Sequence, residues 1–137
     1  MNLKSIHIGK LIYERVNELR MPVGRIEKFM KCSEEEIEQM YQESSIDTFF
    51  LLKWSKLLEY DFFRLYSGHL ILYAPPARTH SISKGKDSLP AFRKHIYTEE
   101  VKNFILEKIA NKEMTLNEVI LKYRIPKTTL YTWIKKS

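Results

Sequence analysis

The amino-acid sequence predicts an all-α protein built from two small helical domains, with five helices in the first, three in the second and a basic linker between them. The first observation is that apolar residues recur at three- and four-residue spacings in both halves of the chain. The second is a stretch rich in proline, serine and basic residues near the middle, which has neither helical nor strand periodicity. The third is a difference in charge between the two halves.

Length and charge define the domains that we expect. The chain has 137 residues, room for two small domains, which we place at residues 1–74 and 96–137, with the linker at 75–95. Residues 1–74 carry 10 Lys or Arg and 11 Asp or Glu, whereas residues 75–137 carry 13 and 6. This positive excess favours a polyanionic partner for the second half, the alternative being a surface that only keeps the protein in solution.

The first domain opens with three predicted helices. One spans residues 6–20 and ends before Pro22. The second covers residues 23–30, and the third starts at Ser33, which forms a capping box with Glu36. The residues expected to face the core are Ile8, Leu11, Ile12, Val16 and Leu19 in the first helix and Ile37, Met40 and Tyr41 in the third.

The remainder of this domain is rich in aromatic residues. We expect a longer helix from Ile46, followed by an aromatic turn or helix up to Tyr66. The inward residues of the long helix are Phe50, Leu51, Trp54, Leu57 and Leu58. The run GHLILY at 68–73 favours a strand or an extended strap, which either covers the core or contacts a second copy, and the sequence does not choose between them.

The linker has two interpretations. Its basic residues are Arg78, Lys84, Lys86, Arg93 and Lys94. An extended basic arm can follow the DNA backbone or enter the minor groove, whereas the plainer interpretation is a flexible, solvated tether. Both remain open.

The second domain begins at residue 96 and contains three predicted helices. Thr98 is an N-cap before the first, whose apolar face is Val101, Ile105 and Ile109. Thr115 and Glu118 form a second capping box, which opens a helix that buries Leu116, Val119 and Ile120. The turn at 123–126 ends that helix.

The last helix spans residues 127–136 and carries the candidate site. With 100° per residue, Leu130, Trp133 and Ile134 cluster on the inner side. The outer side then presents hydroxyl groups and lysines, which can bond base edges and neutralise phosphates in a major groove. The candidate DNA-binding residues are Arg93, Lys94, Arg124, Lys127, Thr128, Thr129, Tyr131, Thr132, Lys135 and Lys136.

The segment TLNEVILKYRIPKTTLYTWIKK resembles the helix-turn-helix of small insertion-sequence transposase proteins and of invertase-type DNA-binding domains. The resemblance covers the chain from Ile96 onward and implies binding to double-stranded DNA. Such motifs often have glycine in the turn between the helices, where this sequence has Arg124. If that residue adopts a left-handed conformation, the arginine is strained by about 1 kcal/mol.

Residues 6–66 resemble a lambda-repressor-like helical domain in the order of their helices. The helix that would read DNA in such a domain is acidic here: it turns Glu35, Gln39 and Gln42 outward. Three further carboxylates, on Glu34, Glu36 and Glu38, flank these residues. Because phosphates would repel them, we favour self-association or docking to a protein for this domain, with DNA reading by this helix as the alternative.

Three classes of function are compatible with these patterns. The leading hypothesis is sequence-specific binding of double-stranded DNA by a transposase-related protein without a catalytic domain, its catalytic subunit being a separate polypeptide. A stand-alone dimeric transcription regulator is the alternative. A protein-interaction module or an enzyme fragment comes third. An enzyme is disfavoured because no carboxylate cluster or activated nucleophile is evident.

The sequence also bounds cofactors and location. The four histidines are scattered and Cys32 is the single cysteine, so we expect no metal, no cofactor and no internal disulfide. No apolar run has the length of a signal peptide or a membrane span. We therefore expect no membrane partner and a cytoplasmic protein associated with the nucleoid, with a homodimer possible through the first domain.

Overall fold

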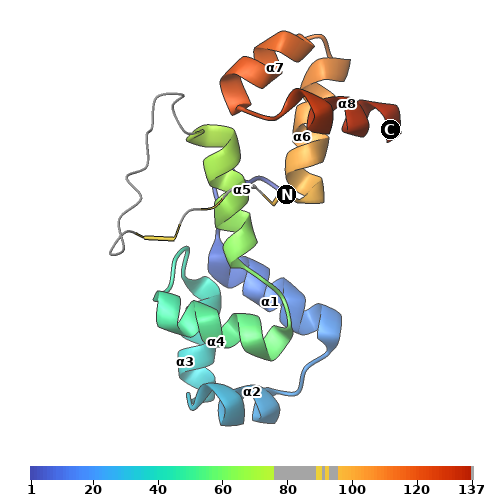
Figure 1. The fold of residues 1–137 in the computed structure, drawn as a ribbon. Helices are drawn as coiled ribbons and strands as arrows, with labels where there is room; N and C mark the ends of the chain where they lie inside the picture. The colour runs from blue at the N-terminus through green and yellow to red at the C-terminus, as the bar shows by residue number, and fades with distance from the viewer. Residues whose placement is uncertain (76–88, 91, 93–95, 137) are drawn as a thin grey trace. The chain divides into compact units, whose positions relative to one another are not determined.

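The computed structural model describes residues 1–75, 89, 90, 92 and 96–136. Within these residues eight α-helices and no strand are present, which confirms the predicted all-α class (Figure 1). The helices are α1 (Ile8–Leu19), α2 (Val23–Met30), α3 (Glu34–Gln42), α4 (Thr48–Leu58), α5 (Phe63–Tyr73), α6 (Glu99–Ala110), α7 (Leu116–Tyr123) and α8 (Lys127–Lys136).

The described residues form two compact units. The N-terminal unit comprises Asn2 and residues 4–65, and the C-terminal unit comprises Met1, Leu3 and the described residues from Tyr66 onward. The boundary therefore falls inside α5. Most of the predicted linker, including Arg93 and Lys94, lies outside the described residues.

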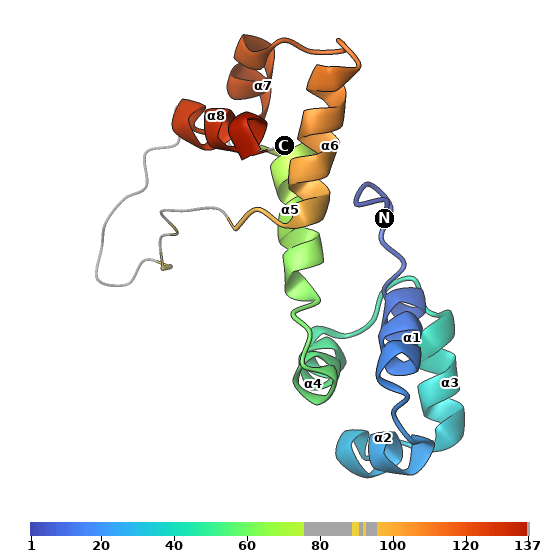
Figure 2. The same ribbon diagram turned by 90° about the vertical axis from the view of Figure 1, so that its right-hand side faces the viewer.

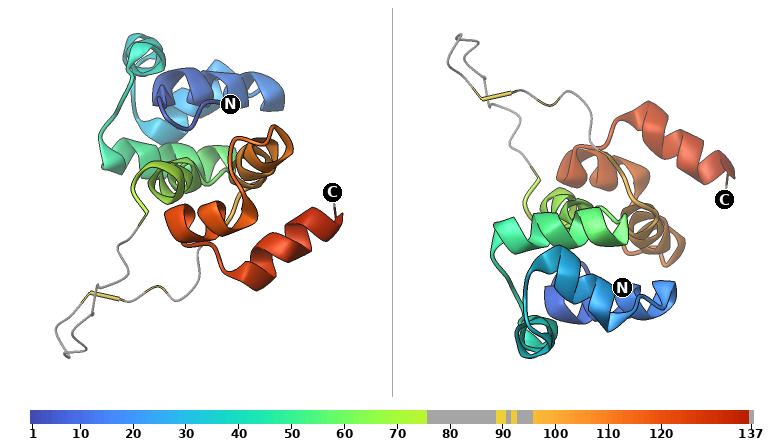
Figure 3. Two further views of the ribbon diagram at one scale, coloured as in Figure 1. Left: turned by 90° about the horizontal axis from the view of Figure 1, so that it is seen from above. Right: turned by 90° about the horizontal axis from the view of Figure 1, so that it is seen from below.

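The N-terminal unit is held together by contacts of α1 and α2 with α3 and α4 (Figure 3). Its helix starts follow the local signals in the sequence. The Ser33 hydroxyl accepts a hydrogen bond from the Glu36 backbone N–H at 3.2 Å, and the Glu36 carboxylate accepts one from the Ser33 N–H at 3.1 Å, as the predicted capping box requires. The side chains that are at most 1% exposed are Ile8, Ile12, Ile26, Met30, Trp54, Leu58 and Phe62.

Gly9 allows α1 to lie against the end of α3. Its backbone N–H donates to the Glu43 carbonyl oxygen at 3.0 Å. A Cβ atom at this position would overlap the carbonyl oxygens of Met40, Tyr41 and Glu43. Any larger residue must push α1 and the end of α3 apart. Glycine is therefore required here because the two segments approach closely, and not because of its backbone freedom.

Two predictions for the first helix need correction. Leu19 is 41% exposed and Leu11 only half-buried, so the buried stripe of α1 is narrower than expected. The helix ends at Leu19 because Arg20 turns into the left-handed region, with φ at 51°. Leu19 therefore lies at the end of the helix, where it is free of the core.

The C-terminal unit includes the second part of α5, and here the predicted strand or strap at residues 68–73 is wrong. These residues are helical, and Gly68 is buried. A Cβ at Gly68 would lie 3.1 Å from Leu3 Cδ1 and 3.2 Å from Val101 Cγ2. The spacing of apolar residues does not distinguish a helix from a strand in so short a run. Here, packing against residues distant in the sequence favours the helix.

The other three helices of this unit pack as a bundle, since α8 contacts both α6 and α7 (Figure 2). Thr98 caps α6 by accepting a hydrogen bond from the Val101 N–H, as predicted. The predicted capping box of Thr115 and Glu118 is also present at the start of α7. The buried apolar residues of these helices and their turn are Val101, Ile105, Val119, Tyr123, Ile125, Leu130 and Trp133.

Candidate nucleic-acid interface

The turn between α7 and α8 sets the direction of the last helix. Arg124 ends α7 in the left-handed region, with φ at 58° and ψ at 34°, and its N–H donates to the Ile120 carbonyl oxygen at 3.1 Å. An arginine therefore adopts the left-handed conformation that glycine commonly adopts at the end of a helix. This conformation strains the arginine by about 1 kcal/mol. Ile125 then enters the core, and Pro126 precedes the first turn of α8.

The inner face of α8 anchors the helix. Leu130 is 1% exposed and Trp133 is 8% exposed, as the spacing predicts, whereas Ile134 is only half-buried. The Tyr97 ring meets the Trp133 ring edge-on, with centroids 5.1 Å apart. These contacts fix the rotation of α8 about its axis and so determine which side chains face outward.

The outer face of α8 carries the candidate residues. Six of them are exposed, in two adjacent rows at four-residue spacing: Lys127, Tyr131 and Lys135 in one row and Thr128, Thr132 and Lys136 in the other. Thr129 is half-buried at the edge of this face. Neither row contains a carboxylate.

Side-chain contacts order part of this surface. The Thr132 hydroxyl donates to the Thr128 carbonyl oxygen at 2.8 Å, which leaves the oxygen lone pairs of Thr132 as acceptors. The Lys127 ammonium lies 5.6 Å from the centroid of the Tyr131 ring, within cation–π range. The face therefore combines cationic groups with a Thr132 hydroxyl that is held close to the helix backbone.

The positive charge extends beyond α8. Residues 119–136 contain Lys122, Arg124, Lys127, Lys135 and Lys136, and no Asp or Glu. Lys122 is an exposed cation in the last turn of α7 that the sequence analysis did not single out, although its place among these cations was visible in the sequence. Arg124 is half-buried in the turn.

The surface of α3 has the opposite charge. Glu34, Glu35, Glu36 and Glu38 are all exposed on it. A hollow in the same surface is lined by Glu34, Glu35, Glu38, Gln39 and Gln42. Phosphates would be repelled from this helix, whereas they would be attracted to α8.

Cys32 does not have the surroundings of a reactive thiol. It is half-buried, and burial raises its pKa, as does the nearby Glu36, while Lys53 has the opposite and smaller effect. A raised pKa means less thiolate at neutral pH and a weaker nucleophile. Within residues 1–75 and 96–136, no three side chains of His, Cys, Asp or Glu gather where they could hold a metal ion.

No protein-family model, no curated protein and no solved structure matches this chain. Among the helices described, none combines the length and the apolar character needed to cross a membrane.

Proposed function

We propose that this chain binds double-stranded DNA in a sequence-specific manner, with α8 entering the major groove, and that it has no catalytic domain of its own. In this proposal α6, α7 and α8 form a helix-turn-helix domain of the transposase-related type. The N-terminal unit, with α1 to α4 and the start of α5, forms a second, repressor-like domain, and residues 75–95 form a basic linker before α6.

One observation carries the proposal: the outer face of α8 is cationic, hydroxylated and without acidic groups. Five cations and no carboxylate occur between residues 119 and 136. Polar side chains on such a helix can bond base edges, and cations at its margins can neutralise phosphates. The N-terminal turn of α8 adds unpaired backbone N–H groups and the positive end of the helix dipole, both of which favour a phosphate.

The charge of the N-terminal unit supports a division of labour. The carboxylates of α3 oppose contact with the DNA backbone, so we assign this unit to self-association or to a protein partner. A separate polypeptide would then supply any strand-transfer chemistry. Because its partner is DNA, we place the protein in the cytoplasm, associated with the nucleoid.

A second candidate function uses the same surface. In a stand-alone dimeric transcription regulator, the N-terminal unit would pair two copies, and the two α8 helices would read half-sites one helical turn apart. The compact N-terminal unit, which is separate from the unit that carries α8, favours this candidate. Its signature would be a palindromic target.

Selection of binding sites from random duplexes by the full chain tests both candidates. A recurring motif supports sequence-specific binding, and two inverted copies of it at a fixed spacing support the dimeric regulator. The matched variant is Thr128→Val, Thr132→Val, which removes two hydroxyl groups from the outer face of α8 and should change the enriched motif. If the variant enriches the same motif as the wild type, α8 is not the reading helix.

A further inference from the structure

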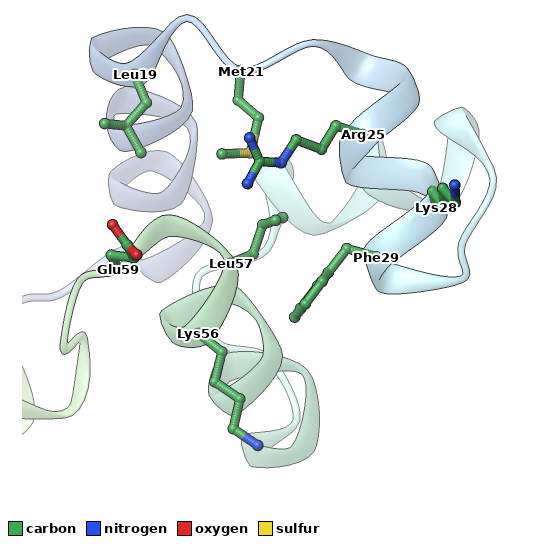
Figure 4. Close-up of a pocket in the computed structure, with 8 residues that line it drawn as sticks. All are labelled: Leu19, Met21, Arg25, Lys28, Phe29, Lys56, Leu57 and Glu59. Carbon is green, nitrogen blue, oxygen red and sulfur yellow. The ribbon is translucent and has the colours of Figure 1, made fainter.

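An open groove in the N-terminal unit has an apolar floor and a basic rim. It lies where the end of α1, α2 and α4 meet and has a volume of about 690 Å³ (Figure 4). Its lining residues are Leu19, Met21, Arg25, Lys28, Phe29, Lys56, Leu57 and Glu59. None of these residues belongs to the DNA-binding surface proposed above.

The floor combines two part-exposed apolar side chains with a buried one. Leu19 is 41% exposed and Phe29 is 43% exposed, and Leu57 closes the floor from α4 with 7% exposed. Figure 4 shows the Phe29 side chain extending from α2 toward α4, and the Leu57 side chain extending from α4 on the side that faces α2. Apolar side chains at the bottom of a groove with a charged rim can anchor a protein partner.

The rim is positive. Arg25, Lys28 and Lys56 stand against a single carboxylate, that of Glu59. Among the residues described, none of these three cations forms an ion pair with a carboxylate. Their charge is therefore available to a ligand, and it selects for a negatively charged one.

We propose that this groove docks an acidic amphipathic helix of a partner protein. The apolar face of such a helix would cover Leu19, Phe29 and Leu57, and its carboxylates would pair with Arg25, Lys28 and Lys56. Recognition of this kind takes its affinity from apolar anchors at three- and four-residue spacing and its specificity from complementary charge.

Other candidate ligands do not match both the apolar floor and the basic rim of the groove. The outward face of α3 in a second copy supplies carboxylates on Glu34, Glu35 and Glu38 but no large apolar side chain. DNA would satisfy the cations and leave the apolar floor uncovered. Residues 76–95 carry five Lys or Arg and one Asp, so their charge is the same as that of the rim.

A designed peptide tests the proposal with the full chain. The probe is a fluorescent helical peptide with leucines at i, i+3 and i+7 and glutamates on its outer face, and its anisotropy is measured as protein is added. The variant Arg25→Glu, Lys28→Glu should bind it at least about tenfold more weakly. The control Lys4→Glu, Lys10→Glu reverses two exposed lysines outside the groove and should change the affinity less than about twofold.

Further variants test the contribution of the apolar floor separately from that of the basic rim, and the groove separately from α8. Phe29→Ser should weaken peptide binding although it changes no charge. Lys127→Glu, Lys135→Glu should retain peptide binding even where DNA binding is lost, so the two proposals fail independently. Circular dichroism establishes that each variant is folded, and Arg25→Gln, Lys28→Gln replaces the charge reversal if that variant is not.

Each contrary result overturns the proposal. The groove is not the site if the peptide does not bind, if the groove and control variants weaken binding equally, or if a lysine version of the peptide binds as well. A loss of DNA affinity in the groove variant without peptide binding would assign the groove to DNA. Concentration-dependent self-association that the groove variant abolishes would assign it to a second copy.

Discussion

Tyr97 meets Trp133 edge-on, with ring centroids 5.1 Å apart and the ring planes at 81°. This contact joins the residue before the cap of α6 to the inner face of α8, and both rings are shielded: burial raises the pKa of Tyr97, and Trp133 is 8% exposed. An edge-to-face pair of this kind adds to the stability gained from burial. The orientation of the candidate DNA-binding face thus depends on an aromatic anchor directly behind it.

Replacing that anchor should unfold the C-terminal unit. We expect Trp133→Ala to lower the free energy of unfolding by about 3 to 5 kcal/mol. Trp54, the other tryptophan, is fully buried in the N-terminal unit, so its fluorescence should report an unchanged melting transition there. The control Tyr131→Ala removes a side chain that is 46% exposed and should change stability by about 0.5 kcal/mol or less. Loss of both transitions in Trp133→Ala would contradict two independently stable units.

Arg124→Gly should separate turn strain from DNA contact. Glycine adopts the left-handed region freely, so the variant should recover up to about 1 kcal/mol of stability, offset in part by glycine's larger entropy in the unfolded chain. Its DNA affinity should fall, because a cation beside α8 is lost. Lys112→Gly is a matched control, since Lys112 also has a positive φ, 59°, and precedes α7 rather than α8. Equal effects of the two variants on DNA affinity would remove Arg124 from the interface.

The hydroxyl groups of Thr128 and Thr132 should determine base preference. Replacement of either by valine keeps the shape of the side chain and removes the hydroxyl group. We expect a change in preference of about 1 to 3 kcal/mol at one or two base pairs, with similar affinity for nonspecific DNA. Competition with single-base variants of the selected site measures it. A uniform loss across all sites would show that these residues position the helix and do not read bases.

Stability at high pH should depend on Tyr41. Its pKa is raised from 10.0 to about 12, chiefly by burial and further by Glu38 and Tyr13. Because the folded state raises the pKa, the stabilisation is complete below pH 10 and is lost as the pH rises toward 12. Urea unfolding of Tyr41→Phe should therefore show a shallower loss of stability over this window than the wild type. Parallel declines would show that Tyr41 ionises normally in the folded protein.

The sequence predicts local features of the fold well and distant packing poorly. The capping boxes at Ser33 and Thr115 involve hydrogen bonds between residues three apart, so their residue types alone are informative. The burial of Leu130 and Trp133 follows from helical spacing in the same way. These local signals are sufficient to place the outer face of α8.

Features that depend on remote residues are not evident from the sequence. Gly9 is required because carbonyl groups more than 30 residues later approach it, and Gly68 lies in a helix that packs on Leu3 and Val101. Leu19 has the spacing of a core residue, but it lies in the last turn of α1 and is 41% exposed there. The apolar groove could not be predicted for the same reason.

The salt dependence of DNA binding is the sharpest test of the proposed role of α8 and its neighbouring cations. For the full chain, a plot of log affinity against log salt should have a slope of about −4 to −6, and Lys127→Ala, Lys135→Ala should make it shallower by about 2. The double variant Lys4→Ala, Lys10→Ala should keep the wild-type slope. A wild-type slope near zero, or equal changes in the two double variants, would contradict the assignment of α8.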